Sequence, residues 1–524
     1  MSTTQLFSLP NELFPYIFQY LSSSQLVELL ADIQSRRLQA LIHSFITNLD
    51  ISKKSDQWLQ YYLPRIFSNS NLNALRLQDR HIPSFYSDFS SSNIQSIQVI
   101  SSDWTTDLLK QGLNYIRQHH YLKQLSIVFT CLHGKGDVAN DLFRRDSQFQ
   151  HLIVTGRFLY FDLKEIEQCN QLKSLSIELE GMHRVFMLIQ NLPNLQELKV
   201  KLRTEERLVQ PKFTCEDNSR LANKLQSVSF TGASKYFDHI EQFFTCVGMA
   251  IEYLCISIDL IYYIIDGKRF QQNVLMKMPR LSSLDLLIHS TLTYCDPIDI
   301  QTFRSSYWQQ FNSIIYWYDI RAHQHTIFTL PYKSDRFKHF SNNFLSSWTS
   351  NEPVSLCFER VRSLSFITTT ALKCETIDFM AKHFPNLKTL ELTDPVHLPG
   401  SEDENVDRQA LIMQEDLLFD RTLQLPSITK LCFVSQLQHD DYDVFRRFLH
   451  LLPNLTHLRM YIGRSLFSRL LLHENVDDFV GNALVRIGCL EMVRFYDEKN
   501  VLSNEEIRNL FPHAEIHFDY DEVR

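Results

Sequence analysis

Glycine is scarce in this sequence, with only 12 among 524 residues. Doubly wound nucleotide-binding sheets and β-rich barrels rely on glycine in their turns, so this scarcity argues against both architectures. Basic charge is lacking as well, because the net charge is −8 and the pI is near 6.2. Without a positive field to attract a phosphate backbone, we expect no nucleic-acid partner.

Paired cysteines and long apolar runs are also missing. The ten cysteines lie far apart without a CxxC pair, which favours a reducing compartment over a disulfide framework. The most apolar window, 249–265, contains Glu252 and Asp259 and falls short of a membrane-spanning helix. The first residues lack the basic and apolar regions of a signal peptide. We therefore expect a protein of the cytoplasm and/or nucleus that makes no membrane contact.

Motifs that carry chemistry are absent from the sequence. It contains no GxGxxG, GxxxxGK[ST], HExxH, GxSxG or EF-hand pattern. His323 and His325 have no cysteine or acidic residue beside them, which is weak evidence for a metal. We expect no enzyme activity, no cofactor and no metal site. The rival hypothesis is a hydrolase or transferase in residues 290–360.

One apolar pattern recurs fourteen times along the chain. An apolar residue is followed three positions later by a second and two positions after that by a third, at steps of mostly about 22 to 30 residues. A segment of helical spacing often precedes the pattern, and a proline such as Pro193, Pro385 or Pro453 then ends the helix. Each unit is therefore predicted as helix, proline break and short strand. The patterns begin at Leu72, Ile94, Leu122, Phe149, Leu172, Leu195, Leu225, Ile251, Leu281, Val361, Leu387, Ile428, Leu455 and Leu490.

The segments LPNLQELKV (192–200), FPNLKTLEL (384–392) and LLPNLTHLRM (451–460) resemble leucine-rich repeats of the helix-containing type. The resemblance implies an α/β fold, an irregular solenoid of horseshoe form over residues 71–524, whose strands line a surface that binds a protein. A gap in the pattern contains two β-rich runs, FNSIIYWYDI (311–320) and HTIFTLPY (325–332). These predict a β-hairpin inserted into the solenoid at about 290–358.

The strand positions that alternate with the buried apolar residues are predicted to face a partner. The last two repeats are the most distinctive, because arginine and tyrosine are enriched where binding energy concentrates. We therefore predict a client-binding surface there, with a mixed solvated face as the alternative. Its residues are His457, Arg459 and Tyr461 on one strand and Met492, Arg494 and Tyr496 on the next.

Residues 4–50 have a different pattern, typical of three short helices, and residues 51–70 are predicted to connect them to the repeats. Apolar residues from Leu9 to Leu21 share one helical face, and Ser22 to Ser24 separate this helix from the next. Pro15 falls inside the first helix, where proline costs a backbone hydrogen bond. Helices this short cannot bury all their apolar side chains among themselves, so some must contact the repeats or another protein.

This segment resembles an F-box, whose opening Leu-Pro-x-Glu-Leu, later Ile-Phe and closing Tyr-Leu match residues 9–21. The resemblance implies docking on a Skp-type adaptor of a cullin ubiquitin ligase, with the repeats binding an unknown protein client. The chain would then be the substrate-recognition subunit of an SCF-type ligase. The alternative is an interaction scaffold whose N-terminal helices only cap the solenoid. The adaptor-binding face would comprise Leu9, Pro10, Glu12, Leu13, Ile17, Phe18, Leu21 and Leu26.

Overall fold

The structure is a computed structural model. It describes residues 9–521 except 34, 68–70, 86–92, 102–106, 118–120, 131–141, 157–165, 204–223, 262–263, 292–297, 312, 320–323, 351–355, 368–372, 394–423, 437–441, 462–477 and 496–503. The chain divides into two compact units, one of Met1–Ile258 with Gln272–Ser283 and one of Asp259–Gln271 with Leu284–Arg524. In the described part of the chain, no helix is long and apolar enough to cross a bilayer.

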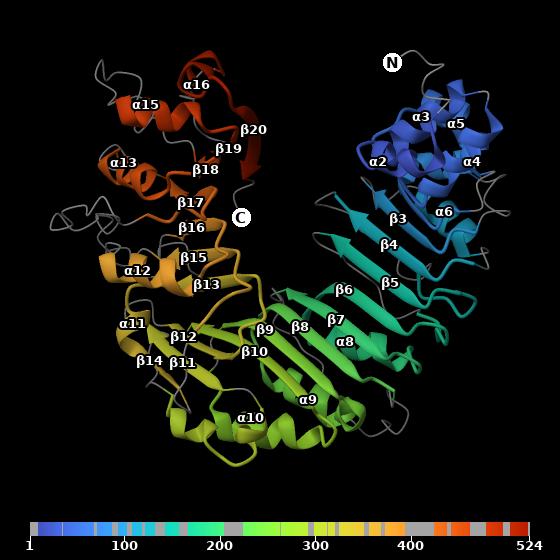
Figure 1. Ribbon diagram of the computed structural model, residues 1–524. Helices are drawn as coiled ribbons and strands as arrows, with labels where there is room; N and C mark the ends of the chain where they lie inside the picture. Colours follow the sequence, from blue (N-terminus) through green and yellow to red (C-terminus); the bar gives the residue numbers. More distant parts are fainter. Residues whose placement is uncertain are drawn as a thin grey trace. The chain divides into compact units, whose positions relative to one another are not determined.

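The first unit begins with the predicted helices (Figure 1). Pro15 lies in the first turn of its helix, where its missing N–H is not needed. The expected cost is avoided because a 3₁₀ turn precedes the helix, so the segment does not form one continuous helix. The elements are η1 (Asn11–Leu13), α2 (Phe14–Phe18), α3 (Ser23–Asp32) and α4 (Arg36–Phe45).

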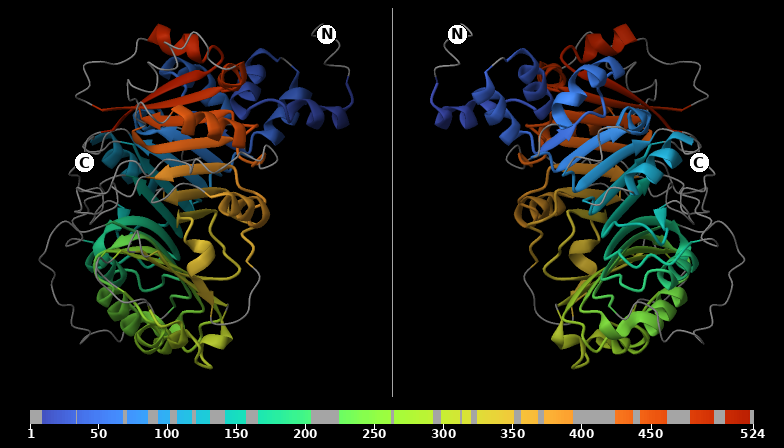
Figure 2. Two further views of the ribbon diagram at one scale, coloured as in Figure 1. Left: turned by 90° about the vertical axis from the view of Figure 1, so that its left-hand side faces the viewer. Right: turned by 90° about the vertical axis from the view of Figure 1, so that its right-hand side faces the viewer.

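The strands of the first unit lie side by side in sequence order, and β1 to β8 are parallel. Figure 2 shows this arrangement from two sides. The first strand lies in the segment that was predicted to be helical, because residues 48–50 pair with residues 74–76. The strands are β1 (Asn48–Asp50), β2 (Ala74–Gln78), β3 (Ser96–Ser101), β4 (Gln124–Phe129), β5 (His151–Gly156), β6 (Ser174–Glu180), β7 (Glu197–Arg203), β8 (Ser227–Ser234) and β9 (Tyr253–Ile261).

The repeating apolar pattern arises because the same positions of neighbouring strands pair with one another in the core. The middle apolar positions of neighbouring repeats are register partners, as in Leu75 with Ile97 and Ile97 with Leu125. Each of these side chains is buried, and burying one stabilises the fold by roughly 1.5–3 kcal/mol. The predicted first positions are buried except at Leu281, which is half-buried, although in the last repeat Leu490 takes the middle position as the partner of Leu458. The predicted alternation of helix and in-register parallel strand is therefore confirmed.

Helices cover the apolar face of this sheet (Figure 1). One of them, α5, occupies the stretch predicted to be a connector. Cys246 in α9 is disulfide-bonded, which differs from the expectation that a reducing compartment is favoured over a disulfide framework. The helices are α5 (Asp56–Phe67), η2 (Asp79–Phe85), α6 (Asp107–Arg117), α8 (Gly181–Gln190), α9 (Asp238–Val247), η6 (Gly248–Ala250) and η7 (Leu275–Lys277).

The second unit contains the predicted hairpin, which forms as β11 (Ile314–Asp319) and β12 (Gln324–Thr329). The hairpin is not a projecting insertion, since β12 pairs with β10 (Ser283–Thr291) and β11 with β14 (Trp348–Ser350), both antiparallel. The region predicted as an insertion also supplies a strand of a second parallel sheet, because β13 (Arg336–Phe340) pairs with residues 363–366. The short helices nearby are α10 (Gly267–Asn273), η8 (Ile300–Phe303), η9 (Trp308–Gln310) and α11 (Phe344–Ser347).

The second parallel sheet continues in sequence order from β13 to β20. Its core is rich in phenylalanine, and Phe358 stacks on Phe384 with ring centroids 4.5 Å apart. The remaining elements are β15 (Ser363–Ile367), α12 (Cys374–His383), β16 (Thr389–Thr393), β17 (Lys430–Gln436), α13 (Tyr442–Leu451), β18 (His457–Tyr461), α15 (Asp478–Val485), β19 (Cys489–Phe495), α16 (Asn504–Leu510) and β20 (Glu515–Asp521).

Candidate functional site

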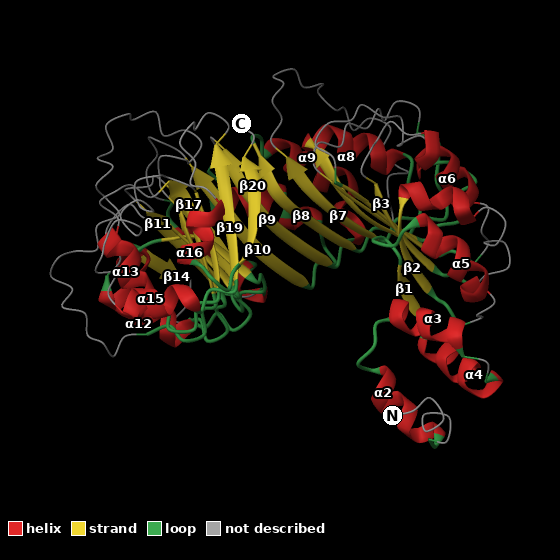
Figure 3. Cartoon of the chain, turned by 90° about the horizontal axis from the view of Figure 1, so that it is seen from above, coloured by secondary structure: helices red, strands yellow, loops and turns green. Residues whose placement is uncertain are grey.

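An apolar surface is exposed on the first turns of the chain. Leu13 is 44% exposed, Tyr16 is 67% exposed and Tyr20 is 82% exposed. Tyr16 lies in α2, and Leu13 and Tyr20 lie in the turns on either side of it. Figure 3 shows that α2 lies at the end of the first unit, beyond α3 and α4. We call Leu13, Tyr16 and Tyr20 the α2 surface. Among the predicted adaptor-binding residues, Pro10 and Glu12 are also exposed, and Leu9, Ile17 and Leu21 are half-buried.

Two predicted adaptor-binding residues belong instead to the interior. Phe18 and Leu26 are each only 3% exposed, and the Phe18 ring contacts Phe14 and Phe45 at centroid distances of 5.3 Å. Phe14 and Phe18 are four residues apart and share one helix face, so both point into the chain. The prediction was wrong for Phe18 and Leu26, because the sequence does not show which apolar face of a short helix is covered internally.

Tyr16 and Tyr20 were not predicted as surface residues. Tyr16 lies in α2 and Tyr20 in the turn that follows it, and both are exposed. The four-residue spacing of Phe14 and Phe18, and of Tyr16 and Tyr20, is a signal that aromatic side chains point in more than one direction here. Only the packing shows which of them remains accessible.

The N-terminal helices are fixed to one another and to the first repeat. Arg37 of α4 donates to Oδ1 of Asn11 from Nε at 2.8 Å and from Nη2 at 2.6 Å. Glu28 of α3 accepts hydrogen bonds from Lys54 at 2.9 Å and from the indole of Trp58 at 2.8 Å. The bond from Lys54, followed by that from Trp58, holds the pKa of Glu28 below its ordinary value. The α2 surface is therefore presented on a connected support.

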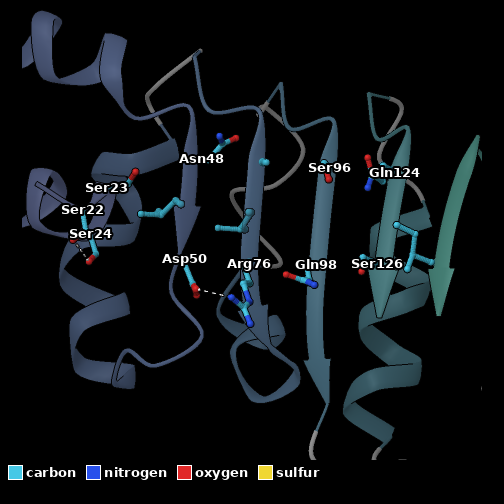
Figure 4. A pocket seen from close by; sticks show the side chains of 14 residues that line it. Ser22, Ser23, Ser24, Asn48, Asp50, Arg76, Ser96, Gln98, Gln124 and Ser126 are labelled. Atoms are coloured by element: carbon cyan, nitrogen blue, oxygen red, sulfur yellow. Dashed lines mark hydrogen bonds and ion pairs between the residues drawn. The ribbon is translucent and has the colours of Figure 1, made fainter. Parts of the chain in front are cut away.

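A cavity of about 530 Å³, open to solvent and lined by both polar and apolar side chains, lies on the sheet face beside these helices. Figure 4 shows side chains from β1 to β4 around it, with the turn of Ser22 to Ser24 on one side. The floor follows the strand register, because Asp50, Arg76, Gln98 and Ser126 are successive partners across four strands. The lining residues are Ser22, Ser23, Ser24, Asn48, Leu49, Asp50, Ala74, Leu75, Arg76, Ser96, Gln98, Gln124, Ser126 and Ile153.

One acid and one base face this cavity and pair with each other. Nη1 of Arg76 lies 3.2 Å from Oδ2 of Asp50. Burial by itself raises the pKa of Asp50, but the hydroxyl and backbone N–H of Ser52, together with Arg76, outweigh it and lower that pKa. The cavity is therefore close to neutral, and carboxamide and hydroxyl groups make up most of its polar surface.

A second charged group lies further along the same sheet. Glu178 on β6 is 6% exposed and accepts from Arg203 at 2.7 Å and Lys201 at 3.0 Å. Burial raises the pKa of Glu178, and the two cations more than offset this and keep it lowered. Because two cations share the one carboxylate of Glu178, this group of three side chains carries a net positive charge.

The predicted client-binding surface in the second unit is present only in part. His457 is exposed and Arg459 is half-buried. Met492, however, is fully buried, so its inclusion was wrong. The apolar positions of this repeat are Ile487, Leu490 and Met492, three residues earlier than predicted for the first position. The side chains of Tyr461 and Arg494 and the whole of Tyr496 lie outside the described residues.

The residue that faces the surface in place of Met492 is Glu491. Its carboxylate lies 2.6 Å from Lys430 and 3.8 Å from Arg459. Burial raises the pKa of Glu491, and Lys430 and Arg459 reverse this effect and lower it. The surface is therefore an ion-pair network across β17 to β19 that contains both positive and negative charges.

The hairpin, where an enzyme was the rival hypothesis, holds buried polar groups bonded to one another. The hydroxyl of Tyr316 lies 2.9 Å from Nδ1 of His325, and Nδ1 of His289 lies 2.9 Å from the hydroxyl of Thr326. Asp319 accepts from Ser341 and Asn343. Such pairing is what buried polar groups in any core require. No cluster able to hold a metal ion occurs among the residues that the structure describes.

No protein-family model and no curated protein matches the chain. Among solved structures, the chain is similar to the Rad7 and Elc1 complex of yeast, with a TM-score of 0.31, 11% identity, and coverage of 77% of this chain and 91% of that one. It is also similar to a TLR13–ssRNA13 complex, with a TM-score of 0.24, 11% identity, and coverage of 90% of this chain and 62% of that one. At these TM-scores the function must be argued from the residues of this chain.

Proposed function

We propose that the chain is the substrate-recognition subunit of an SCF-type cullin ubiquitin ligase. On this proposal the N-terminal helices dock on a Skp-type adaptor, and the repeats bind a protein client. The observation that carries the proposal is the α2 surface, where Leu13, Tyr16 and Tyr20 are exposed within a segment that resembles an F-box. Exposed apolar clusters of this kind are typical of protein-interaction sites, and tyrosine is enriched at their centres.

The anchoring of the helices supports this role. A recognition subunit acts by raising the effective concentration of its client beside another enzyme, so it needs no catalytic residue of its own. A loose tether would weaken that effect. The bonds from Lys54 and Trp58 to Glu28 join α3 to the first repeat and restrict such movement. We propose accordingly that the chain is not an enzyme and acts in the cytoplasm and/or nucleus.

Co-purification with a Skp-type adaptor tests the proposal. We expect the wild-type chain to bind the adaptor, and Tyr16→Asp combined with Tyr20→Asp to abolish binding because charge would be placed on the docking face. Tyr121→Asp is the matched control, since Tyr121 is also exposed, at 58%, but lies outside the helical segment. Absence of binding at micromolar concentration contradicts the proposal. Adaptor binding that is unchanged both in the Tyr16→Asp, Tyr20→Asp variant and in the Leu9→Ala, Pro10→Ala variant also contradicts the proposal.

A repeat scaffold whose helices only cap the first coil is the second candidate. The burial of Phe14, Phe18 and Leu26 favours it, because Phe14 and Phe18 pack on each other and on Phe45 of α4, while α3, which carries Leu26, contacts β1. In a capping role the α2 surface has no partner. The tyrosine substitutions would then leave every interaction of the chain unchanged.

A further inference from the structure

We propose that the open cavity beside Ser22 to Ser24, whose lining includes three carboxamides and five hydroxyls, binds an extended peptide segment of polar, uncharged character. The identification of that peptide as part of the client rests on the proposed function, whereas the binding itself does not. The cavity lies wholly in the first unit, so one continuous set of strands and one turn of the N-terminal helices form it.

The side chains that face the cavity match the chemistry of a peptide backbone. Asn48, Gln98 and Gln124 each carry a carboxamide, which both donates and accepts hydrogen bonds, as a peptide group does. The structure gives these three side chains no hydrogen-bond partner among the described residues. Their donors and acceptors are therefore available to a peptide laid over the strands.

Other classes of ligand fit the lining less well. The only cation in the lining is Arg76, which is paired with Asp50, so little charge is available for the phosphates of a nucleic acid. The 14 lining residues include no aromatic side chain, so the cavity offers no stacking platform for a base or a sugar ring. A largely apolar ligand would leave the carboxamides without partners.

The dimensions suit a short stretch of extended chain. Neighbouring strands lie about 4.8 Å apart, so the row from Asp50 to Ser126 spans roughly 14 Å. An extended peptide covers that length with about four residues. A cavity of about 530 Å³ also lies within the range of roughly 300–1,000 Å³ that is usual for ligand pockets.

The rim of the cavity is ordered by its own hydrogen bonds. The backbone N–H of Ser22 donates to Oε1 of Gln25 at 2.8 Å, and the backbone N–H of Gln25 donates to the Ser22 hydroxyl at 3.3 Å. This reciprocal pair is a capping arrangement at the start of α3. A peptide held there would lie beside the helices that carry the α2 surface.

Fluorescence anisotropy of the full chain without adaptor tests the inference. The probes are labelled eight-residue peptides with blocked ends, composed only of serine, asparagine and glutamine, so that they carry no charged side chain. A chitin oligosaccharide and an eight-nucleotide oligo(dT) are the comparison ligands. We expect the peptides alone to bind, and Gln98→Ala with Gln124→Ala to weaken binding about tenfold, as the loss of side-chain hydrogen bonds predicts.

The matched control is Gln196→Ala with Gln226→Ala, since both glutamines are exposed and lie outside the cavity. The double variant with these two substitutions should bind the peptides as tightly as the wild type does. The inference is overturned if no peptide binds the folded chain, if both pairs weaken binding equally, or if the oligosaccharide or the oligonucleotide binds instead. Peptide binding without adaptor binding would refute the ligase proposal alone, and the converse result would refute this inference alone.

Discussion

The indole N–H of Trp58 donates a 2.8 Å hydrogen bond to Oε1 of Glu28, and so joins α5 of the first repeat to α3 of the N-terminal segment. The same oxygen accepts from Lys54 at 2.9 Å, and the Lys54 ammonium lies 5.1 Å from the centroid of the Trp58 ring. Three side chains thus share one junction. The ionised form of Glu28 strengthens this junction.

This junction predicts a pH-dependent stability. The pKa of Glu28 is lowered from its ordinary value of 4.5 in the folded chain, so its contribution is present above that value and is lost as the pH falls through the folded pKa. We expect Glu28→Gln to be less stable than the wild type at pH 7, by at most about 1 kcal/mol because the group is partly exposed. Thermal unfolding should show this difference shrinking below pH 4.5. A difference independent of pH, or an equal effect of Glu12→Gln on the exposed surface, would refute the assignment.

Substitutions of a buried and an exposed aromatic residue near the end of α2 should separate folding from binding. Phe18→Ala removes a buried ring and should lower the free energy of unfolding by about 3–5 kcal/mol. Tyr20→Ala, on the exposed face, should change it by less than about 0.5 kcal/mol and still weaken adaptor binding. Chemical denaturation and adaptor titration measure the two effects. Comparable destabilisation by both substitutions would show that the helix faces are assigned wrongly.

Close backbone packing should make Gly232 intolerant of a side chain. Its φ is +100°, and a Cβ atom there would lie 2.0 Å from the carbonyl oxygen of Leu202 on the neighbouring strand. We expect Gly232→Ala to lower the free energy of unfolding by at least about 1–3 kcal/mol. Gly488→Ala is the control, since no atom lies within 4 Å of its added Cβ. Equal Tm values for the two variants would contradict this packing.

The register of β19 predicts opposite roles for two neighbouring residues. Met492→Ala should destabilise the second unit by about 2–5 kcal/mol because it leaves a cavity. Glu491→Ala should have a small effect on stability and should alter binding at the surface that contains Lys430 and Arg459. Urea denaturation distinguishes these outcomes. A large loss of stability for Glu491→Ala with none for Met492→Ala would show that Glu491 faces the core and Met492 the surface, as the sequence predicted.

Much of the fold was predictable because the repeat is a local pattern. Leu75, Ile97 and Leu125 are buried and in register as expected, since each strand carries its own alternation of apolar and polar residues. The last repeat was misplaced because Leu490, Met492 and Val493 offer two apolar frames of similar quality. The error is three residues, and because side chains alternate along a strand, any odd-numbered shift exchanges its two faces.

The candidate site was less predictable. Asp50 and Arg76 come from segments predicted to be a helical domain and a repeat, yet the pairing of β1 with β2 makes them neighbours. Ser22 to Ser24 were assigned only a helix-breaking role, although they form one side of the cavity. No pattern along the chain connects these residues, because their proximity depends on strand pairing between distant segments.

By itself, then, the sequence determined that this protein is built from alternating helices and parallel strands. Its regularly spaced apolar residues can be buried together when successive repeats stack on one another. Tertiary structure alone decided that Phe18 lies inside while Tyr20 remains exposed, and that Gln98 and Gln124 face a cavity. The reason is physical. Spacing fixes which residues share a face, but only contact with distant parts of the chain decides whether that face is covered.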